Sequence, residues 1–196
     1  MEAEPPVTAR RLVIGEDDVQ ASIRSRAAQA GQPASLEVAS LLRLLAEASE
    51  VRHAVEVGSS GGVTGGWLMA GMGARGVLTS IESDSHQHTL ASAAYADLGV
   101  GDRVRAILGD AATVLGRLSD DQYDLVLLQG PEVSRHLVAA ERLLRDGGLL
   151  VVRGVDAADG AAVLEAISGQ DRWMATVLPL DGGLLLARLG AAEPTG

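Results

Sequence analysis

The pattern of apolar and polar positions changes once along the chain, near residue 50. Before that point, a polar helical pattern over residues 16–30 is closed by the turn at residues 31–33. A second helix is predicted over residues 35–49, where leucine and alanine recur at helical spacing and Ser35 is the expected N-cap. Residues 1–15 show neither pattern, and we predict a flexible tail there.

After residue 50, short apolar runs alternate with helical stretches. Near-continuous apolar strands separated by helices are typical of a parallel sheet that is covered on both faces. The strands are expected at Ala54–Val57, Val77–Ile81, Val104–Leu108, Leu125–Leu128 and Leu149–Val152. The helices that follow them are expected at Thr64–Met72, His86–Leu98, Ala111–Leu118, Val133–Leu144 and Ala158–Ile167.

The chain ends with two apolar runs around the turn at residues 181–183, which predicts a hairpin that adds an antiparallel strand. We therefore expect one α/β domain over residues 16–196. Residues 16–50 would form a helical lid. Residues 51–190 would form a three-layer, doubly wound, Rossmann-like core with a mostly parallel seven-stranded sheet.

Composition narrows the function classes. The 196 residues carry a formal net charge of −10, which argues against nucleic acid or an anionic membrane as a partner. The chain has no cysteine, so disulfides, zinc–thiolate sites and cysteine nucleophiles are excluded. The apolar runs are too short to span a bilayer, and no signal peptide is visible at the N-terminus. A cytoplasmic location is the expectation.

The most informative motif is EVGSSGGVT, which spans Glu56–Thr64 at the end of the first predicted strand. Ligands of open α/β sheets bind beyond the C-terminal ends of the strands, where spaced glycines let the backbone approach a ligand closely. Glu82 ends the second strand, where a carboxylate can accept hydrogen bonds from ribose hydroxyl groups. Ser60 stands at the second glycine of the dinucleotide pattern G-x-G-x-x-G, which disfavours a nicotinamide-dependent oxidoreductase. The glycines of the motif are Gly58, Gly61 and Gly62.

At these residues the chain resembles the S-adenosylmethionine-dependent O-methyltransferases of the catechol and caffeoyl-CoA type, over about residues 16–190. The resemblance implies a class I methyltransferase fold with S-adenosyl-L-methionine as cofactor. Glu56–Thr64 would hold its methionine moiety, LTSIES (Leu78–Ser83) its ribose and adenine, and LGDA (Leu108–Ala111) its adenine. The residues implicated in cofactor binding are Ala34, Glu56, Gly58, Ser59, Thr64, Glu82, Ser83, Asp110, Ala111 and Gln129, with Ser35 beside Ala34.

Some of these residues have a structural alternative. Glu82 could cap the following helix, Asp110 could be the N-cap of the helix that begins at Ala111, and Thr64 could be a simple helix-start residue. Gly65 and Gly66 are expected to serve packing alone.

The chain departs from the family at the metal site. The family holds a divalent cation with an Asp after the fourth strand and an Asp-Asn pair after the fifth, beside a Lys. Here Gln129, Arg153 and Gly154 stand at the ligand positions and Glu132 stands at the Lys position. A neutral amide is a poor ligand for magnesium and an arginine repels a cation, so no metal is expected. The catalytic residues stay unassigned, with Glu132 and Arg153 as candidates expected to lie together over the vacated position.

The four histidines do not restore a metal site. His86 and His88 are two residues apart, so they point to different faces of a helix. His136 is expected on the solvent face of a helix, and His53 precedes the first strand. Any of the four could serve as a general base.

We expect metal-independent O-methyl transfer to a small-molecule acceptor, by a homodimer as is common among bacterial relatives of the family. The alternative is a catalytically degenerate protein that binds S-adenosylmethionine or S-adenosylhomocysteine in a regulatory or interaction role. An oxidoreductase is the third and less favoured hypothesis.

Overall fold

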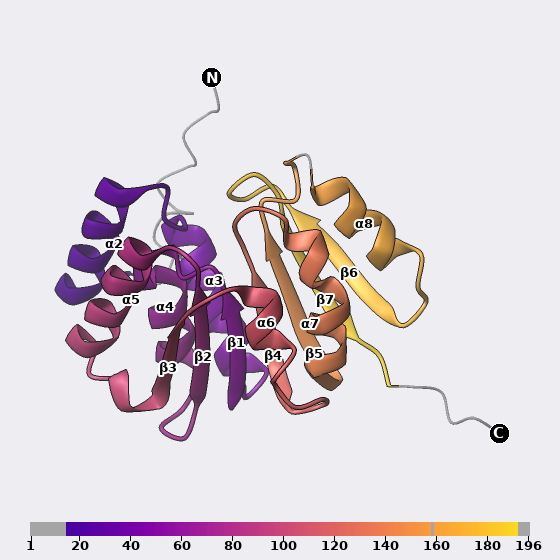
Figure 1. The fold of residues 1–196 in the computed structure, drawn as a ribbon, viewed down its shortest axis with the longest axis horizontal. Coiled ribbons are helices and arrows are strands. Elements are labelled where there is room, and N and C mark those ends of the chain that lie inside the picture. The colour runs from indigo at the N-terminus through magenta and orange to yellow at the C-terminus, as the bar shows by residue number, and fades with distance from the viewer. Residues whose placement is uncertain (1–14, 158, 192–196) are drawn as a thin grey trace.

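A seven-stranded sheet forms the middle layer of the computed structural model, which describes residues 15–157 and 159–191 (Figure 1). The strands are β1 (His53–Val57), β2 (Val77–Glu82), β3 (Val104–Leu108), β4 (Tyr123–Leu128), β5 (Leu144–Arg153), β6 (Trp173–Leu178) and β7 (Leu184–Leu189). Their order is β3-β2-β1-β4-β5-β7-β6. The first five strands are parallel, and β7 is antiparallel to both β5 and β6. The predicted doubly wound α/β fold with a C-terminal hairpin is confirmed.

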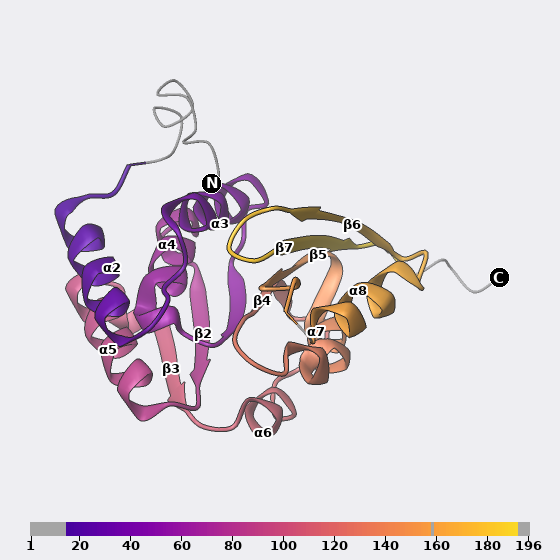
Figure 2. The ribbon, with the colours of Figure 1, turned by 90° about the horizontal axis from the view of Figure 1, so that it is seen from above.

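Helices cover both faces of this sheet, as the view from above shows (Figure 2). They are α2 (Asp18–Ala30), α3 (Leu36–Ala48), α4 (Val63–Gly71), α5 (Ser85–Asp97), α6 (Ala111–Leu115), α7 (Leu137–Leu143) and α8 (Gly160–Ser168). Helices α2 to α5 contribute to one apolar cluster, and α6 to α8 contribute to a second cluster on the other face. The predicted lid helices α2 and α3 therefore share a core with the sheet.

Strand β4 shows why the apolar runs are nearly continuous. Leu125 and Leu127 belong to the first cluster, whereas Val126 and Leu128 belong to the second. All four side chains are fully buried. Both faces of a central parallel strand are covered, so neither tolerates a polar side chain here.

The structure corrects several element boundaries. The helix expected over 133–144 is divided into a 3₁₀ turn at Val133–His136 and the helix α7. Strand β5 begins at Leu144, five residues before the expected Leu149, because Leu144 already pairs with Tyr123 of β4. Helix α6 ends at Leu115, earlier than expected. The tail predicted over residues 1–15 lies outside the described residues, apart from Gly15.

In the glycine motif, Gly61 and Gly62 face neighbouring helices and do not line the cavity at the C-terminal ends of the parallel strands, so helix packing alone accounts for both glycines. They adopt positive φ angles of 62° and 90°. A Cβ atom on Gly61 would lie 2.8 Å from the Cβ of Ala27 in α2, and one on Gly62 would lie 2.5 Å from the Cβ of Ala94 in α5. The turn after β1 is thus fixed by its contact with these two helices.

No helix in the described part of the chain has the length and apolar character needed to cross a membrane.

We predict that Gly62→Ala destabilises the protein more than Gly99→Ala does. Both glycines have a positive φ, 90° and 66°, and an alanine in that region costs about 1–2 kcal/mol. Only Gly62 would also place its new Cβ against a neighbour, because Gly99 has open space around it. Overpacking adds about 1–3 kcal/mol. Urea unfolding of both variants measures the difference, and equal losses of unfolding free energy would contradict the packing role.

Candidate active site

A cavity of about 360 Å³ opens at the C-terminal ends of the parallel strands. Its wall combines the glycine turn after β1, the residues that follow β2 to β5, and the segment between α2 and α3. The residues singled out from the sequence that line it are Gly58, Glu82, Ser83, Asp110, Ala111, Gln129, Glu132 and Arg153.

Four of the predicted cofactor residues lie behind this wall. Ala34, Glu56, Ser59 and Thr64 are at most 1% exposed and do not line the cavity. Each of them is hydrogen-bonded to other protein groups. The backbone N–H of Ala34, for example, donates to Ser60 Oγ at 3.0 Å. Direct contact between these four residues and a ligand stays a prediction.

Glu56 is the centre of a buried hydrogen-bond network. Its Oε1 accepts from Ser80 Oγ and from Tyr95 Oη, both at 2.6 Å, and its Oε2 accepts from Thr64 Oγ1 at 2.8 Å. Burial raises the pKa of Glu56 to about 7, although the three hydrogen bonds oppose that shift. Gly65 leaves the space for this network, because a Cβ there would lie 2.3 Å from Tyr95 Oη.

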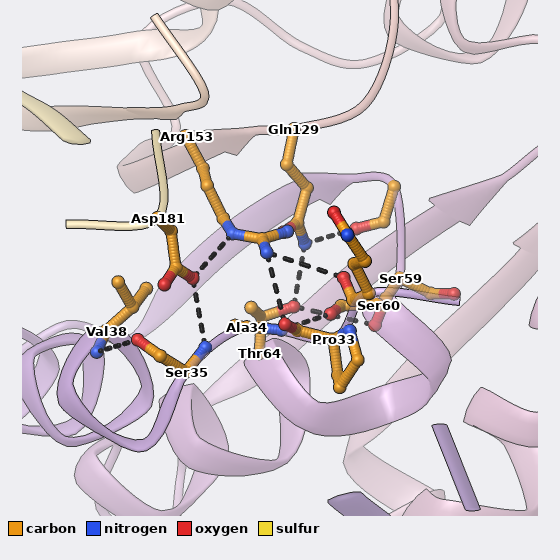
Figure 3. Close-up of polar contacts among 12 residues, drawn as sticks. Pro33, Ala34, Ser35, Val38, Ser59, Ser60, Thr64, Gln129, Arg153 and Asp181 are labelled. Carbon is orange, nitrogen blue, oxygen red and sulfur yellow. Dashed lines mark hydrogen bonds and ion pairs between the residues drawn. The ribbon is translucent and has the colours of Figure 1, made fainter. Parts of the chain in front are cut away.

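The network extends to Gln129 at the cavity wall (Figure 3). Gln129 Nε2 donates to the carbonyl oxygen of Gly58 at 2.7 Å and to Thr64 Oγ1 at 2.8 Å. The Thr64 hydroxyl donates to Glu56, so it can only accept from the amide, and this fixes the orientation of Gln129. Gln129 Oε1 is buried and has no partner among the described residues. An unpaired buried acceptor costs about 1–3 kcal/mol, so this oxygen is suited to receive a donor from a ligand.

Glu82 is held at the end of β2 by the glycine motif. Its Oε2 accepts from the backbone N–H and the hydroxyl of Ser59, at 2.9 and 2.8 Å, and its Oε1 accepts from the N–H of Asp84 at 3.0 Å. The N-cap of α5 is Asp84, which accepts from the N–H of Gln87. The structural alternative for Glu82 as a helix cap is therefore wrong, and its carboxylate lines the cavity.

Asp110 has its predicted structural role and also lies at the cavity, whereas its contact with a ligand stays a prediction. It is the N-cap of α6, where its Oδ1 accepts from the backbone N–H and the hydroxyl of Thr113 at 2.8 and 2.7 Å. These hydrogen bonds lower the pKa of Asp110. The residue also lines the cavity together with Ala111.

The expected pairing of Arg153 with Glu132 is wrong. Arg153 Nε donates to Asp181 Oδ2 at 2.8 Å, and Glu132 instead pairs with the exposed Arg135. The reason is the hairpin: Arg153 pairs with Leu184 in the register of β5 and β7, which brings the preceding turn over the end of β5. The sequence predicted the turn at residues 181–183, but not that the carboxylate of Asp181 in this turn would bind Arg153.

His136 lines the cavity, which corrects its expected place on a solvent face. It ends the 3₁₀ turn that interrupts the predicted helix, so its direction could not follow from helical periodicity. Its Nδ1 is buried with no partner among the described residues. Burial and, to a smaller extent, the neighbouring Arg135 lower the pKa of His136.

The residues at the family's metal positions do not fit a divalent cation. Gln129 offers one neutral oxygen there, and the Arg153 side chain brings a permanent positive charge. Within residues 15–157 and 159–191, no group of three or more His, Asp or Glu side chains is arranged to hold a metal ion.

Comparison with known proteins gives consistent matches. A family described as a methyltransferase domain matches residues 55–153. A candidate O-methyltransferase of Mycolicibacterium vanbaalenii is 40% identical, with 95% of this chain and 90% of that protein covered. A cofactor-bound crystal structure from MTB has a TM-score of 0.85 at 26% identity and covers 98% of this chain and 100% of that one. The O-methyltransferase TomG from Streptomyces achromogenes, in complex with SAM, shares the fold with a TM-score of 0.83 at 23% identity, covering 94% and 95% of the two chains.

We predict that Glu56→Gln removes a pH-dependent part of the stability. Folded Glu56 stays protonated to about pH 7, whereas its ordinary pKa is 4.5, so unfolding releases a proton between these values. The contribution of the buried carboxyl is complete below pH 4.5 and is lost as the pH rises through 7. The unfolding free energy of the wild type should therefore fall relative to Glu56→Gln by about 3 kcal/mol across this window. Denaturant titrations at several pH values measure it, and a constant difference would refute the raised pKa.

Proposed function

The chain belongs to the family of S-adenosylmethionine-dependent O-methyltransferases, as its motifs predicted, and on that premise we propose that it methylates an oxygen of a small-molecule acceptor without a metal ion. The observation that carries the proposal is the cavity that joins Gly58, Glu82 and Gln129 at the C-terminal ends of three neighbouring strands.

The groups around this cavity fit the parts of S-adenosylmethionine. The unpaired, buried Gln129 Oε1 is suited to accept from the ammonium group of the methionine moiety. Glu82 presents a carboxylate for the ribose hydroxyl groups. Ser83, Asp110 and Ala111 form the side of the cavity proposed for the adenine. That the TomG neighbour was crystallised with SAM supports the same cofactor here.

The buried residues act through the residues that line the cavity. Thr64, anchored by Glu56, sets the orientation of the Gln129 amide. Ser59 holds the Glu82 carboxylate through two hydrogen bonds. We propose that these three residues are positioning residues. Ala34 has the same role for the hydroxyl of Ser60, which lines the cavity.

The bound cofactor supplies a methyl group on a sulfonium, which is intrinsically reactive toward a nucleophilic oxygen. The protein's contribution is then chiefly to bring that oxygen close and in line with the methyl group, which is a large effect on the rate without any strong base. An acceptor whose oxygen is readily ionised reacts by proximity alone. This supports a reaction that needs no metal, in keeping with the Arg153 charge at the family's metal position.

Three further expectations stay predictions of this proposal. They are a homodimer, a cytoplasmic location and the absence of a nucleic-acid partner. The alternative of a degenerate cofactor-binding protein is less favoured, because the relatives are named for the transfer activity. Radiolabelled methyl transfer from S-adenosylmethionine to a panel of hydroxylated acceptors separates an enzyme from a binding protein.

We predict that Glu82→Ala weakens the binding of S-adenosylhomocysteine by about 1–3 kcal/mol, because hydrogen bonds to a charged, partly buried carboxylate are lost. Isothermal titration gives the dissociation constant. Glu165→Ala, on the exposed face of α8, is the matched control and should bind like the wild type. An unchanged constant in Glu82→Ala would remove Glu82 from the site, and tight binding of NAD in its place would contradict the proposed cofactor.

Divalent cations should leave both cofactor binding and methyl transfer unchanged. The physical reason is that Gln129 and Arg153 offer no anionic oxygen at the metal position of the family. The measurement compares S-adenosylhomocysteine affinity and methyl transfer in EDTA with the same quantities in magnesium, manganese or calcium. Activity that disappears with EDTA and returns with magnesium would refute metal independence.

A further inference from the structure

We propose that Arg153 recognises the methyl acceptor and that this acceptor carries a carboxylate beside the hydroxyl group to be methylated. The inference rests on the proposed function for the position of the methyl donor. It adds a substrate class and a specificity-determining residue to that function.

Arg153 is held on two sides by three hydrogen bonds (Figure 3). Its Nε donates to Asp181 Oδ2 at 2.8 Å, and its Nη2 donates to the carbonyl oxygens of Pro33 at 3.1 Å and Gln32 at 3.4 Å. Asp181 is itself fixed, because the same Oδ2 accepts from the backbone N–H of Ser35 at 2.9 Å. A side chain that is already ordered loses little conformational entropy when it binds a ligand.

The donors of this guanidinium are only partly used. One N–H of Nε and two of Nη2 account for the three hydrogen bonds above, and an arginine has five N–H groups. The two N–H groups of Nη1 have no partner among the described residues. Nη1 is not one of the buried atoms that lack a partner in the described residues, so it is accessible to solvent. Arg153 lines the cavity, and in the proposed arrangement the two N–H groups of Nη1 meet the ligand there.

The pairing with Asp181 leaves N–H donors of Arg153 for a second anion. Arg and carboxylate groups bind most strongly through two parallel hydrogen bonds, but Asp181 meets Arg153 through one oxygen and one nitrogen. The other two acceptors, on Gln32 and Pro33, are neutral carbonyl groups. The side chains of Arg153 and Asp181 are only 19% and 11% exposed, so solvent screens an interaction between the guanidinium and a bound anion weakly.

The sheet register places this charge beside the proposed cofactor. Val57 of β1 pairs with Leu128 of β4, which pairs with Val152 of β5. The next residue of each strand stands in the same order along the sheet edge: Gly58, Gln129 and Arg153. A carboxylate on Arg153 therefore lies one strand away from the place proposed for the methionine end of the donor. A hydroxyl group on the adjacent carbon of the ligand would lie on the Gln129 side.

The other residues that line the cavity also favour recognition of the acceptor by polar groups. No Trp or Tyr side chain is among the residues that line the cavity, so an acceptor cannot be held by stacking on either ring. In the reaction, the acceptor's hydroxyl oxygen bonds to the methyl carbon as the carbon–sulfur bond breaks. The hydroxyl proton passes to water, and the products are a methyl ether and S-adenosylhomocysteine.

The test uses pairs of probes that differ in a carboxylate next to the hydroxyl-bearing carbon: 2-hydroxybenzoate with phenol, and lactate with propane-1,2-diol. Calorimetric titration into the protein saturated with S-adenosylhomocysteine gives each affinity. We expect the carboxylate member of at least one pair to bind at least tenfold more tightly. Arg153→Met should remove that preference, whereas Arg172→Met, which removes a guanidinium paired with Glu141 on the surface, should keep it.

Asp181→Asn separates recognition from a structural role. The asparagine oxygen can still accept from Ser35 and Arg153, but the competing negative charge is gone, so carboxylate affinity should rise several-fold. A purely structural clamp predicts that Asp181→Asn and Arg153→Met both weaken binding. That result, or the absence of a carboxylate preference in both pairs, overturns the proposal. Failure to bind S-adenosylhomocysteine would instead contradict the proposed function, and it is measured separately in every variant.

Discussion

The hydrogen-bonded carboxyl group of Glu56 is the constraint on which the geometry of the site depends. It is fully buried beneath the sheet edge, and it receives hydroxyl groups from β2, α4 and α5. Through Thr64 it fixes which way the Gln129 amide points, and through that amide it fixes the carbonyl group of Gly58. A network of this kind is effective only when its members are satisfied, and Gln129 Oε1 is its one buried atom without a partner among the described residues.

The second half of the site is organised by a different interaction. Where the family places a metal ion, Arg153 carries the positive charge on a side chain and is held by the turn of the C-terminal hairpin. The antiparallel strand β7 is therefore more than a cover for the sheet edge, because its register with β5 delivers Asp181. In the proposed role, the two N–H groups of Arg153 Nη1 favour an anionic acceptor over a neutral diol.

Local patterns predicted the elements well and their long-range partners poorly. The continuous apolar run of β4 requires burial on both faces, so the parallel sheet and its layers could be predicted. The partner of Arg153 could not, because a turn residue 28 positions away has no periodic relation to it. His136 was misplaced for another reason: the 3₁₀ turn breaks the helical phase from which its direction was predicted. At Gly61 and Gly62, the sequence does not show whether a ligand or a neighbouring helix requires the absence of a side chain.

Asp181 Oδ2 accepts from both Ser35 and Arg153, and the position of Asp181 near the end of the chain bears on when this side of the cavity can form. Ser35 and Asp181 are 146 residues apart, so their contact is among the most non-local in the molecule. On the ribosome, the helices, the glycine turn and the first five strands are all synthesised before the hairpin emerges. The Asp181 carboxylate, which accepts from Arg153 and from the backbone N–H of Ser35, is therefore among the last groups of the site to be synthesised.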